Sequence, residues 1–216
     1  MGSLEEFVEA TQIAQATVIQ FALETYRRRK PKMSCVALCH FMTHVPDIKL
    51  GVSDYYGKKK LAFDWLQRTY QPLLPSLQFD KRRWNAGSEF KGGLWIVNDH
   101  QFAYQDHVLE WRVLYEGQDT GASGSQVVEV EADSSAHFTD ISWALPETAS
   151  GEFEIDVAIK NNEGETVAAN HYTLLVGDQE AAKSQSLKYL DAALLRLQKH
   201  GHSVYRYWPE MWEEFE

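Results

Sequence analysis

Long apolar runs are missing from this 216-residue chain. A membrane-spanning helix needs about 20 consecutive apolar residues, and no stretch approaches that length. The first six residues are partly acidic and contain no apolar segment, so they do not predict a signal peptide. We therefore expect no membrane partner and a cytoplasmic location for the chain as read. Residues 1–3 (Met-Gly-Ser) also fit a vector-derived start, in which case the chain is a piece of a longer protein.

Cysteine is scarce, because the chain has only Cys35 and Cys39. The apolar residues around them predict a strand, in which side chains four apart share one face and lie about 13 Å from each other. A disulfide requires Cα atoms within about 7 Å, so these two cysteines cannot bridge each other. We expect both to be buried free thiols.

Positive charge is in short supply overall. The chain carries 21 Lys and Arg against 31 Asp and Glu, a net charge of −10, which argues against nucleic-acid binding. Residues 1–74 have ten basic and seven acidic residues, a net of +3, whereas residues 75–216 have 11 and 24, a net of −13. This change of sign suggests two units with different surfaces. The densest basic run, residues 27–32, comes where a helix should end, and cations there stabilise the negative end of the helix dipole.

Familiar catalytic motifs are absent as well. The sequence has no Gly-rich phosphate loop, no Gly-x-Ser-x-Gly elbow and no Cys-x-x-Cys pair. His40 and His44 lie four apart but have no Glu between them, so the zinc motif His-Glu-x-x-His is missing, and we predict neither a metal nor a cofactor. Asp47 and Asp54 follow the predicted strand, where turn-forming carboxylates are more common than ligands. His40, His44 and Asp47 are the candidates for contacts to a substrate.

The first 74 residues predict a fragment of an α/β fold. Apolar residues recur at helical spacing over residues 4–29, where Ser3 and Glu6 form a capping box and Pro31 ends the helix. Residues 34–42 are almost continuously apolar, which is typical of a strand buried on both faces. Residues 58–70 predict a second amphipathic helix, and residues 71–75 a linker.

The rest of the chain alternates with period two and then becomes helical again. Short apolar-polar strands are expected at residues 94–97, 108–115, 126–131, 138–145, 153–160 and 167–176. This spacing predicts an immunoglobulin-like β-sandwich over residues 75–177, without the cysteine pair of antibody domains. Residues 178–201 predict a further helix, and we expect the aromatic tail after it to pack back on the chain.

Two segments near the start resemble glycoside hydrolase family two, above all its β-mannosidase and exo-glucosaminidase branch. Residues 12–31 are similar to the last-but-one helix of that family's barrel. Residues 52–62, which contain Asp-Tyr-Tyr-Gly followed by lysines, resemble the segment that opens the barrel's last helix. The resemblance implies that residues 1–74 are the C-terminal remnant of a (β/α)8 barrel. In such a barrel, the loop carrying Asp47 belongs to the catalytic face.

The resemblance continues into the sandwich and reaches about residue 177. Residues 95–99, residues 109–113 and Asn170-His171-Tyr172 are similar to the immunoglobulin-like domain that follows the family's barrel. The sequence also departs from the family, since Cys39 stands where a tryptophan is usual and the Asn-Asp pair after it is replaced by Met42-Thr43. The family's two catalytic glutamates lie on barrel strands that would precede this chain, and no residue here matches them.

The expected architecture is therefore a barrel remnant (1–74), an all-β sandwich (75–177) and a C-terminal helix with an aromatic tail (178–216). The resemblance implies a non-catalytic C-terminal region of a glycosidase, whose partner would be the missing N-terminal part of the parent enzyme. Retaining glycosidases need two carboxyl groups about 5–5.5 Å apart, and this chain supplies no such pair by motif. One alternative is a carbohydrate-binding sandwich that uses Trp84, Phe102 or Tyr104. The other is a stand-alone interaction protein whose helices dock a partner. Separately, the unpaired strand of the barrel remnant favours self-association of the chain.

Overall fold

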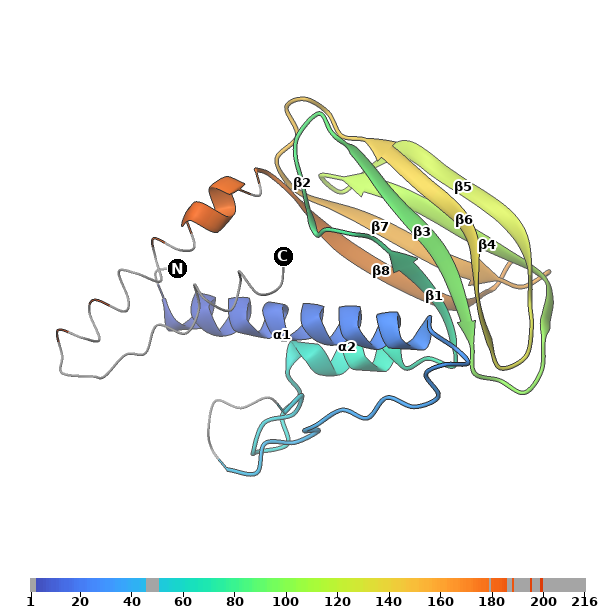
Figure 1. The fold of residues 1–216 in the computed structure, drawn as a ribbon, viewed down its shortest axis with the longest axis horizontal. Coiled ribbons are helices and arrows are strands. Elements are labelled where there is room, and N and C mark those ends of the chain that lie inside the picture. The colour runs from blue at the N-terminus through green and yellow to red at the C-terminus, as the bar shows by residue number, and fades with distance from the viewer. Residues whose placement is uncertain are drawn as a thin grey trace.

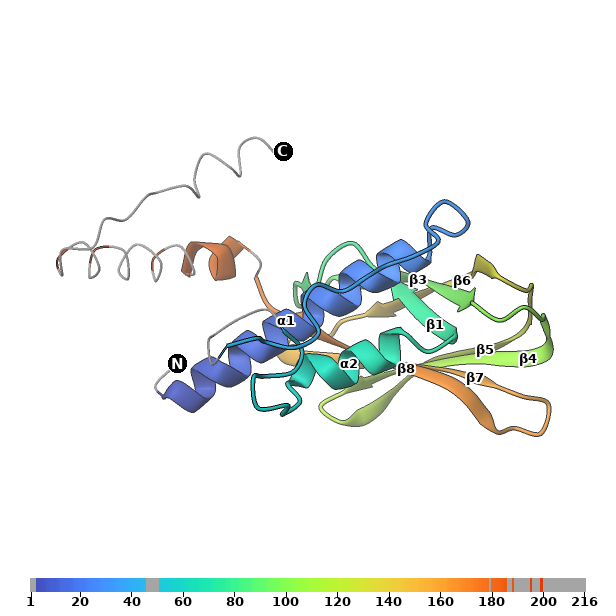
Figure 2. The same cartoon turned by 90° about the horizontal axis from the view of Figure 1, so that it is seen from below.

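The computed structural model describes residues 3–45, 51–178 and 180–185, together with positions 188, 195 and 199. In it, a two-sheet β-sandwich lies against a pair of helices (Figure 1). Helices α1 (Leu4–Arg27) and α2 (Leu61–Thr69) lie side by side, and the N-terminal half of α1 extends beyond the sandwich (Figures 1 and 2). Among the described helices, none is both long enough and apolar enough to cross a membrane.

The sandwich contains eight strands within the described residues. One sheet has the order β1-β3-β6 and the other the order β2-β8-β7-β4-β5, with every pairing antiparallel except β2 with β8. The strands are β1 (Leu73–Gln78), β2 (Arg83–Trp84), β3 (Glu89–Asn98), β4 (Tyr104–Tyr115), β5 (Gln118–Val130), β6 (Ser134–Ala144), β7 (Gly151–Lys160) and β8 (Thr166–Val176). The predicted sandwich is confirmed.

Apolar side chains at every second position of the strands fill the space between the two sheets. In β7, Phe153, Ile155, Val157 and Ile159 are all buried, and the intervening residues are half-buried or exposed. The core also includes Trp84, whose ring packs edge-on against Phe90. Trp84 is therefore not available to stack on a sugar, and this candidate of the carbohydrate-binding alternative is wrong.

The expected linker at residues 71–75 is instead the start of strand β1. Leu73, Leu74 and Leu77 are buried there, and the strand pairs with β3 along its full length. Pro75 is tolerated because β1 forms an edge of its sheet, where a missing backbone donor costs little. The sandwich thus follows α2 almost directly.

The predicted strand at residues 34–42 is not formed. Both Cys35 and Cys39 are exposed, so the expectation of buried thiols is also wrong. Within the described residues, the segment pairs only through isolated contacts, such as the bridge between Met42 and Ser53. A strand needs neighbouring strands to accept its hydrogen bonds, and this part of the chain has no sheet beside it. The structure therefore does not show a barrel remnant.

Helix α1 forms as expected but buries a different face. Ser3 accepts a hydrogen bond from the backbone N–H of Glu6 at 3.2 Å, which confirms the predicted cap. Of the apolar stripe that should have faced the core, Val18 is 66% and Phe21 is 54% exposed. The buried residues of α1 are Ala16, Gln20, Leu23, Glu24 and Arg27. A mainly polar face thus meets the sandwich and α2, and Val18 and Phe21 of the expected apolar stripe stay exposed.

Only the beginning of the predicted third helix can be compared. Residues 180–185 are helical, and the backbone N–H groups of Glu180 and Ala181 are capped by the carboxylate of Asp178 at 2.8 and 3.0 Å. The expected aromatic tail, residues 203–216, lies outside the described residues.

Candidate functional site at the helix–sandwich junction

A buried carboxylate joins helix α1 to the sandwich. Glu24 of α1 is only 2% exposed. Its Oε2 accepts hydrogen bonds from the hydroxyl groups of Ser76 and Tyr172, each at 2.6 Å. Its Oε1 accepts from the side-chain amides of Asn170 at 2.9 Å and Gln20 at 3.0 Å. Both oxygens therefore have two donors, which a charge buried away from water requires.

Arg28 places a positive charge beside this carboxylate. Its Nη1 lies 3.7 Å from Oε2 of Glu24 and donates to Oγ of Ser76 at 2.6 Å. Burial lowers the pKa of the Arg28 guanidinium, and the neighbouring Glu24 partly offsets that effect. Ser76 thus accepts from the cation and donates to the anion, so it connects the two charges.

Tyr172 supports the junction from strand β8. Its hydroxyl group donates to Glu24 and accepts the backbone N–H of Leu77 at 2.9 Å. Complete burial, followed by the nearby negative charge of Glu24, raises the pKa of Tyr172 well above its ordinary value. The phenol therefore stays protonated and remains a donor to the carboxylate. Asn170 completes the link by donating to the carbonyl of Pro75 at 3.0 Å.

The basic run at the end of α1 contacts acidic groups of the sandwich. Arg27 donates to Asp99 at 2.7 Å, to the carbonyl of Gln71 at 2.9 Å and to the carbonyl of Thr69. Lys30 lies 2.6 Å from Asp99 and 2.5 Å from Asp133. Burial lowers the pKa of Lys30, but its hydrogen bonds to Asp133 and Asp99 outweigh this and raise the pKa overall.

This arrangement explains the uneven charge of the sequence. The run lies at a helix end, as predicted, but its cations also pair with the carboxylates of Asp99, just after β3, and of Asp133, just before β6. The positive and negative halves of the chain are therefore complementary surfaces at one junction.

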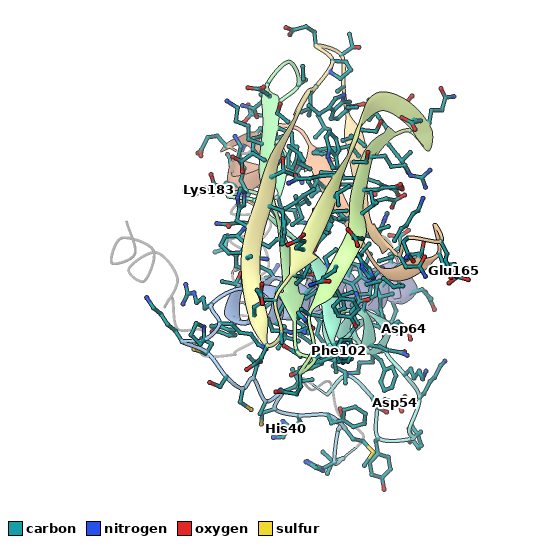
Figure 3. The ribbon with its side chains drawn as sticks, turned by 90° about the vertical axis from the view of Figure 1, so that its right-hand side faces the viewer. His40, Asp54, Asp64, Phe102, Glu165 and Lys183 are labelled. Atoms are coloured by element: carbon teal, nitrogen blue, oxygen red, sulfur yellow. The ribbon has the colours of Figure 1, made fainter. Side chains whose placement is uncertain are left out.

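The residues predicted for substrate contact lie elsewhere. The rings of His40 and His44 meet edge-on at a centroid distance of 5.6 Å, and both residues are exposed. Asp47 lies outside the described residues. Oδ1 of Asp54 accepts the backbone N–H groups of Tyr56 and Lys58 at 2.9 and 2.8 Å, as the turn-forming interpretation predicts. Figure 3 shows His40 and Asp54 on the segment below the sandwich.

Sequence reasoning missed the junction residues Glu24, Ser76 and Arg28. One signal was available, since Asn170-His171-Tyr172 belongs to the resemblance and supplies two members of the cluster. A second signal is the charge of Glu24 on the same helix face as Leu23 and Arg27. Across the described residues, no group of three His, Cys, Asp or Glu side chains is arranged to hold a metal ion.

An apolar cavity opens beside the junction. It has a volume of about 250 Å³, and the junction residues Gln20, Glu24, Arg28 and Tyr172 form part of its wall. The remaining wall includes Val18, Phe21, Leu77, Phe79, Lys81 and Arg82. The cavity is therefore apolar with a basic margin.

A polar groove of about 790 Å³ lies on the outer face of the five-stranded sheet. In it, Asp156 accepts from Nε and Nη2 of Arg112 at 3.0 and 2.8 Å, and its other oxygen lies 2.8 Å from Nδ1 of His171. Nε2 of His171 lies 3.4 Å from the hydroxyl of Thr173, which imitates a catalytic triad. Because Arg112 already pairs with the carboxylate of Asp156, we interpret these side chains as a cross-strand cluster of charged and polar groups.

Comparison with known proteins finds a shared fold. No protein-family model matches the chain, and no curated protein does. Solved structures do match, among them the exo-chitosanase CsxA of Amycolatopsis orientalis, with a TM-score of 0.66 at 15% identity over 82% of this chain. The β-D-mannosidase of Dictyoglomus thermophilum matches with a TM-score of 0.61 at 16% identity over 81% of this chain.

These matches confirm the expected resemblance at the level of the fold. In both cases the matched region is 20% of the other protein's chain, so this chain spans about a fifth of the length of the enzymes it resembles. The chain has the fold of one region of an exo-chitosanase and of a β-D-mannosidase.

Proposed function

We propose that this chain is a non-catalytic C-terminal region of a glycosidase similar to glycoside hydrolase family two, and specifically to its β-mannosidase and exo-glucosaminidase branch. The observation that carries the proposal is the buried Glu24 cluster, which binds helix α1, against which α2 packs, to a sandwich of the fold found in such enzymes. Its function would be to hold those helices in place for the part of the enzyme that precedes them.

The same proposal assigns residues 1–74 to the end of a (β/α)8 barrel. The segment 34–42 supports this assignment, because it is nearly all apolar and yet leaves Cys39 and Phe41 exposed here. A barrel strand separated from its neighbours would behave in this way, since both of its faces and both of its edges lose their partners. Such unpaired edges also favour self-association of the isolated chain.

The exposed apolar side chains of α1 support a contact with the preceding part of the parent enzyme. Phe7, Val18 and Phe21 are each exposed by at least two fifths, and at 100° per residue they lie on the face of α1 opposite Ala16 and Leu23. Apolar side chains on two opposite faces are typical of a helix that is buried between two bodies. The sandwich and α2 form one body, and the preceding part of the parent enzyme would form the other.

A glycosidase assay tests the non-catalytic role. The purified chain should release no nitrophenol from nitrophenyl β-mannoside, β-glucoside, β-galactoside or β-glucosaminide, because it supplies neither member of the required carboxylate pair. Release that a single carboxylate substitution in this chain abolishes would overturn the proposal.

A further inference from the structure

The apolar cavity beside the junction has room for one aromatic side chain. Its volume is about 250 Å³, below the roughly 300–1,000 Å³ typical of sites for small-molecule ligands. Its wall includes Leu77 and Tyr172, which are buried, and the ring of Phe79, which packs edge-on against Tyr172 at a centroid distance of 6.2 Å. Phe21 of α1, which is 54% exposed, also lines it. The cavity therefore offers an apolar surface that a single ring would cover.

The margin of the cavity is basic. Besides the paired charges of the junction, its lining includes Lys81, Arg82 and one exposed carboxylate, Asp80. The side chain of Arg82 donates to the hydroxyl group of Thr17 on α1. Burial lowers the pKa of the Arg82 guanidinium, and the charge of Glu152 offsets this effect only in part. An occupant that brings carboxylates next to Lys81 and Arg82 would therefore complement the margin.

The C-terminal part of the chain is long enough to reach the cavity. Thr173 of β8 lines the cavity and precedes residue 185 by 12 positions, so at most about 42 Å separates the two. Even with residues 186–201 helical, as the sequence predicts, residues 186–212 span up to about 60 Å. The chain also leaves β8 at the end of the sandwich beyond which α1 extends (Figures 1 and 2). The segment after residue 185 can therefore return to the cavity of its own chain.

The last residues combine large rings with negative charge. Residues 203–216 contain four Glu and one Arg, a net charge of −3. Trp212 has Glu210, Glu213 and Glu214 within two positions of it. Trp208 has only one Glu within the same distance, together with one Arg. Complementarity with the basic margin therefore selects Trp212 as the ring that fills the cavity.

We propose that the indole of Trp212 docks in this cavity of its own chain, and that the glutamates around it pair with Lys81 and Arg82. A tryptophan side chain buries about 150–250 Å² when it is covered, so the ring supplies most of the contact. Its N–H group needs an acceptor when buried, and the carboxylate of Asp80 at the margin is available for that. The C-terminal segment would thus fasten α1 to the sandwich a second time, beside the Glu24 cluster.

Docking there leaves the outer face of α1 free. The cavity lies on the flank of α1 that carries Thr17 and Phe21. At 100° per residue, Val18 is turned by about 100° from Thr17, and it contributes only to the edge of the cavity. Phe7 and Val18 therefore remain available for the contact proposed with the parent enzyme. The two contacts of α1 are compatible, and neither requires the other.

Disulfide trapping in the full chain tests this proposal. The exposed Cys35 and Cys39 are first replaced by serine, and Lys81→Cys is then combined with Glu213→Cys. We expect this pair to form an intramolecular disulfide under oxidised glutathione at least about tenfold faster than Glu163→Cys with Glu213→Cys, because docking raises the effective concentration of the two thiols. Glu163 is exposed in the turn between β7 and β8, away from the cavity, which makes it the matched control.

Two further substitutions identify the ring that docks. Trp212→Ala should slow the disulfide between positions 81 and 213 to the control rate, whereas Trp208→Ala should leave its rate unchanged. Circular dichroism should show that both variants are folded at the temperature of the assay. Equal rates for the two cysteine pairs, or a rate that Trp212→Ala does not change, would show that the proposal is wrong. A disulfide found only between two chains would also contradict it, because the cavity would then hold the C-terminal segment of a second copy.

Discussion

The hydroxyl group of Tyr172 donates a hydrogen bond of 2.6 Å to the carboxylate of Glu24, although 148 positions separate the two residues. This bond joins the last strand of the sandwich to the first helix of the chain. The two residues are buried, so the loss of either one takes a hydrogen bond from the other at a place that water does not reach.

Loss of the Tyr172 hydroxyl should destabilise the protein. Tyr172→Phe removes the donor to Glu24 and the acceptor for the N–H of Leu77, and leaving such buried groups unsatisfied costs about 1–3 kcal/mol. Urea unfolding should show this loss as a lower midpoint with an unchanged slope. Tyr56→Phe is the control, since Tyr56 is 80% exposed, and its midpoint should stay at the wild-type value. Equal midpoints for both variants would show that the junction contributes nothing.

Removal of the carboxylate should cost more than removal of the phenol. Glu24→Ala leaves four donors and the cation of Arg28 without their shared acceptor, and breaking a buried ion pair from one side costs about 3–5 kcal/mol. Glu24→Gln keeps an acceptor and the shape of the side chain, so it should lie between Glu24→Ala and the wild type in urea unfolding. A Glu24→Ala protein as stable as the wild type would contradict this account of the cluster.

Stability should fall at high pH because of Tyr172. Its pKa is raised in the folded state above the ordinary value of 10.0, so the folded protein keeps a proton that the unfolded chain releases. The resulting stabilisation is complete below pH 10.0 and is lost as the pH rises through the folded pKa. The free energy of unfolding, measured between pH 9 and 11, should fall less steeply in Tyr172→Phe than in the wild type. An identical slope in the two proteins would show that Tyr172 does not titrate differently on folding.

The aromatic tail should stabilise the folded chain. Residues 203–216 combine large rings with Glu210, Glu213 and Glu214, and we expect them to pack over residues 1–74, whose net charge is +3. Deleting residues 203–216 should therefore lower the melting temperature by several degrees. Raising the salt concentration should not reproduce that loss, because exposed ion pairs contribute only about 0–1 kcal/mol. An unchanged melting temperature, with rapid proteolysis of the tail in the intact chain, would contradict the prediction.

Local sequence patterns predicted which helices and strands form better than they predicted which faces of those elements are buried. Period-two alternation in residues 153–160 identified β7, and helical spacing with the Ser3 cap identified α1. Such signals depend on residues close together in the sequence, so a single sequence suffices to detect them. The face that α1 buries could not be predicted in this way. Its polar residues Gln20 and Glu24 are buried because Asn170 and Tyr172, far along the chain, satisfy them.

The prediction of a strand at residues 34–42 was wrong for a related reason. Its apolar run is typical of a buried strand, but burial and backbone pairing depend on neighbouring strands that the described part of the chain does not supply. The candidate residues His40 and His44 came from the same interpretation and fall on an exposed segment.

The most direct test of the central claim is co-purification with the polypeptide encoded immediately upstream of residue 1. We expect the two pieces to form a stable complex through the exposed stripe of α1, and Val18→Glu to break it. Val127→Glu on β5 is the matched control, because Val18 and Val127 are both 66% exposed, and this variant should leave the complex intact. If no upstream polypeptide binds the wild-type chain, or if both variants bind equally well, the chain is not the C-terminal region of a larger enzyme held through α1.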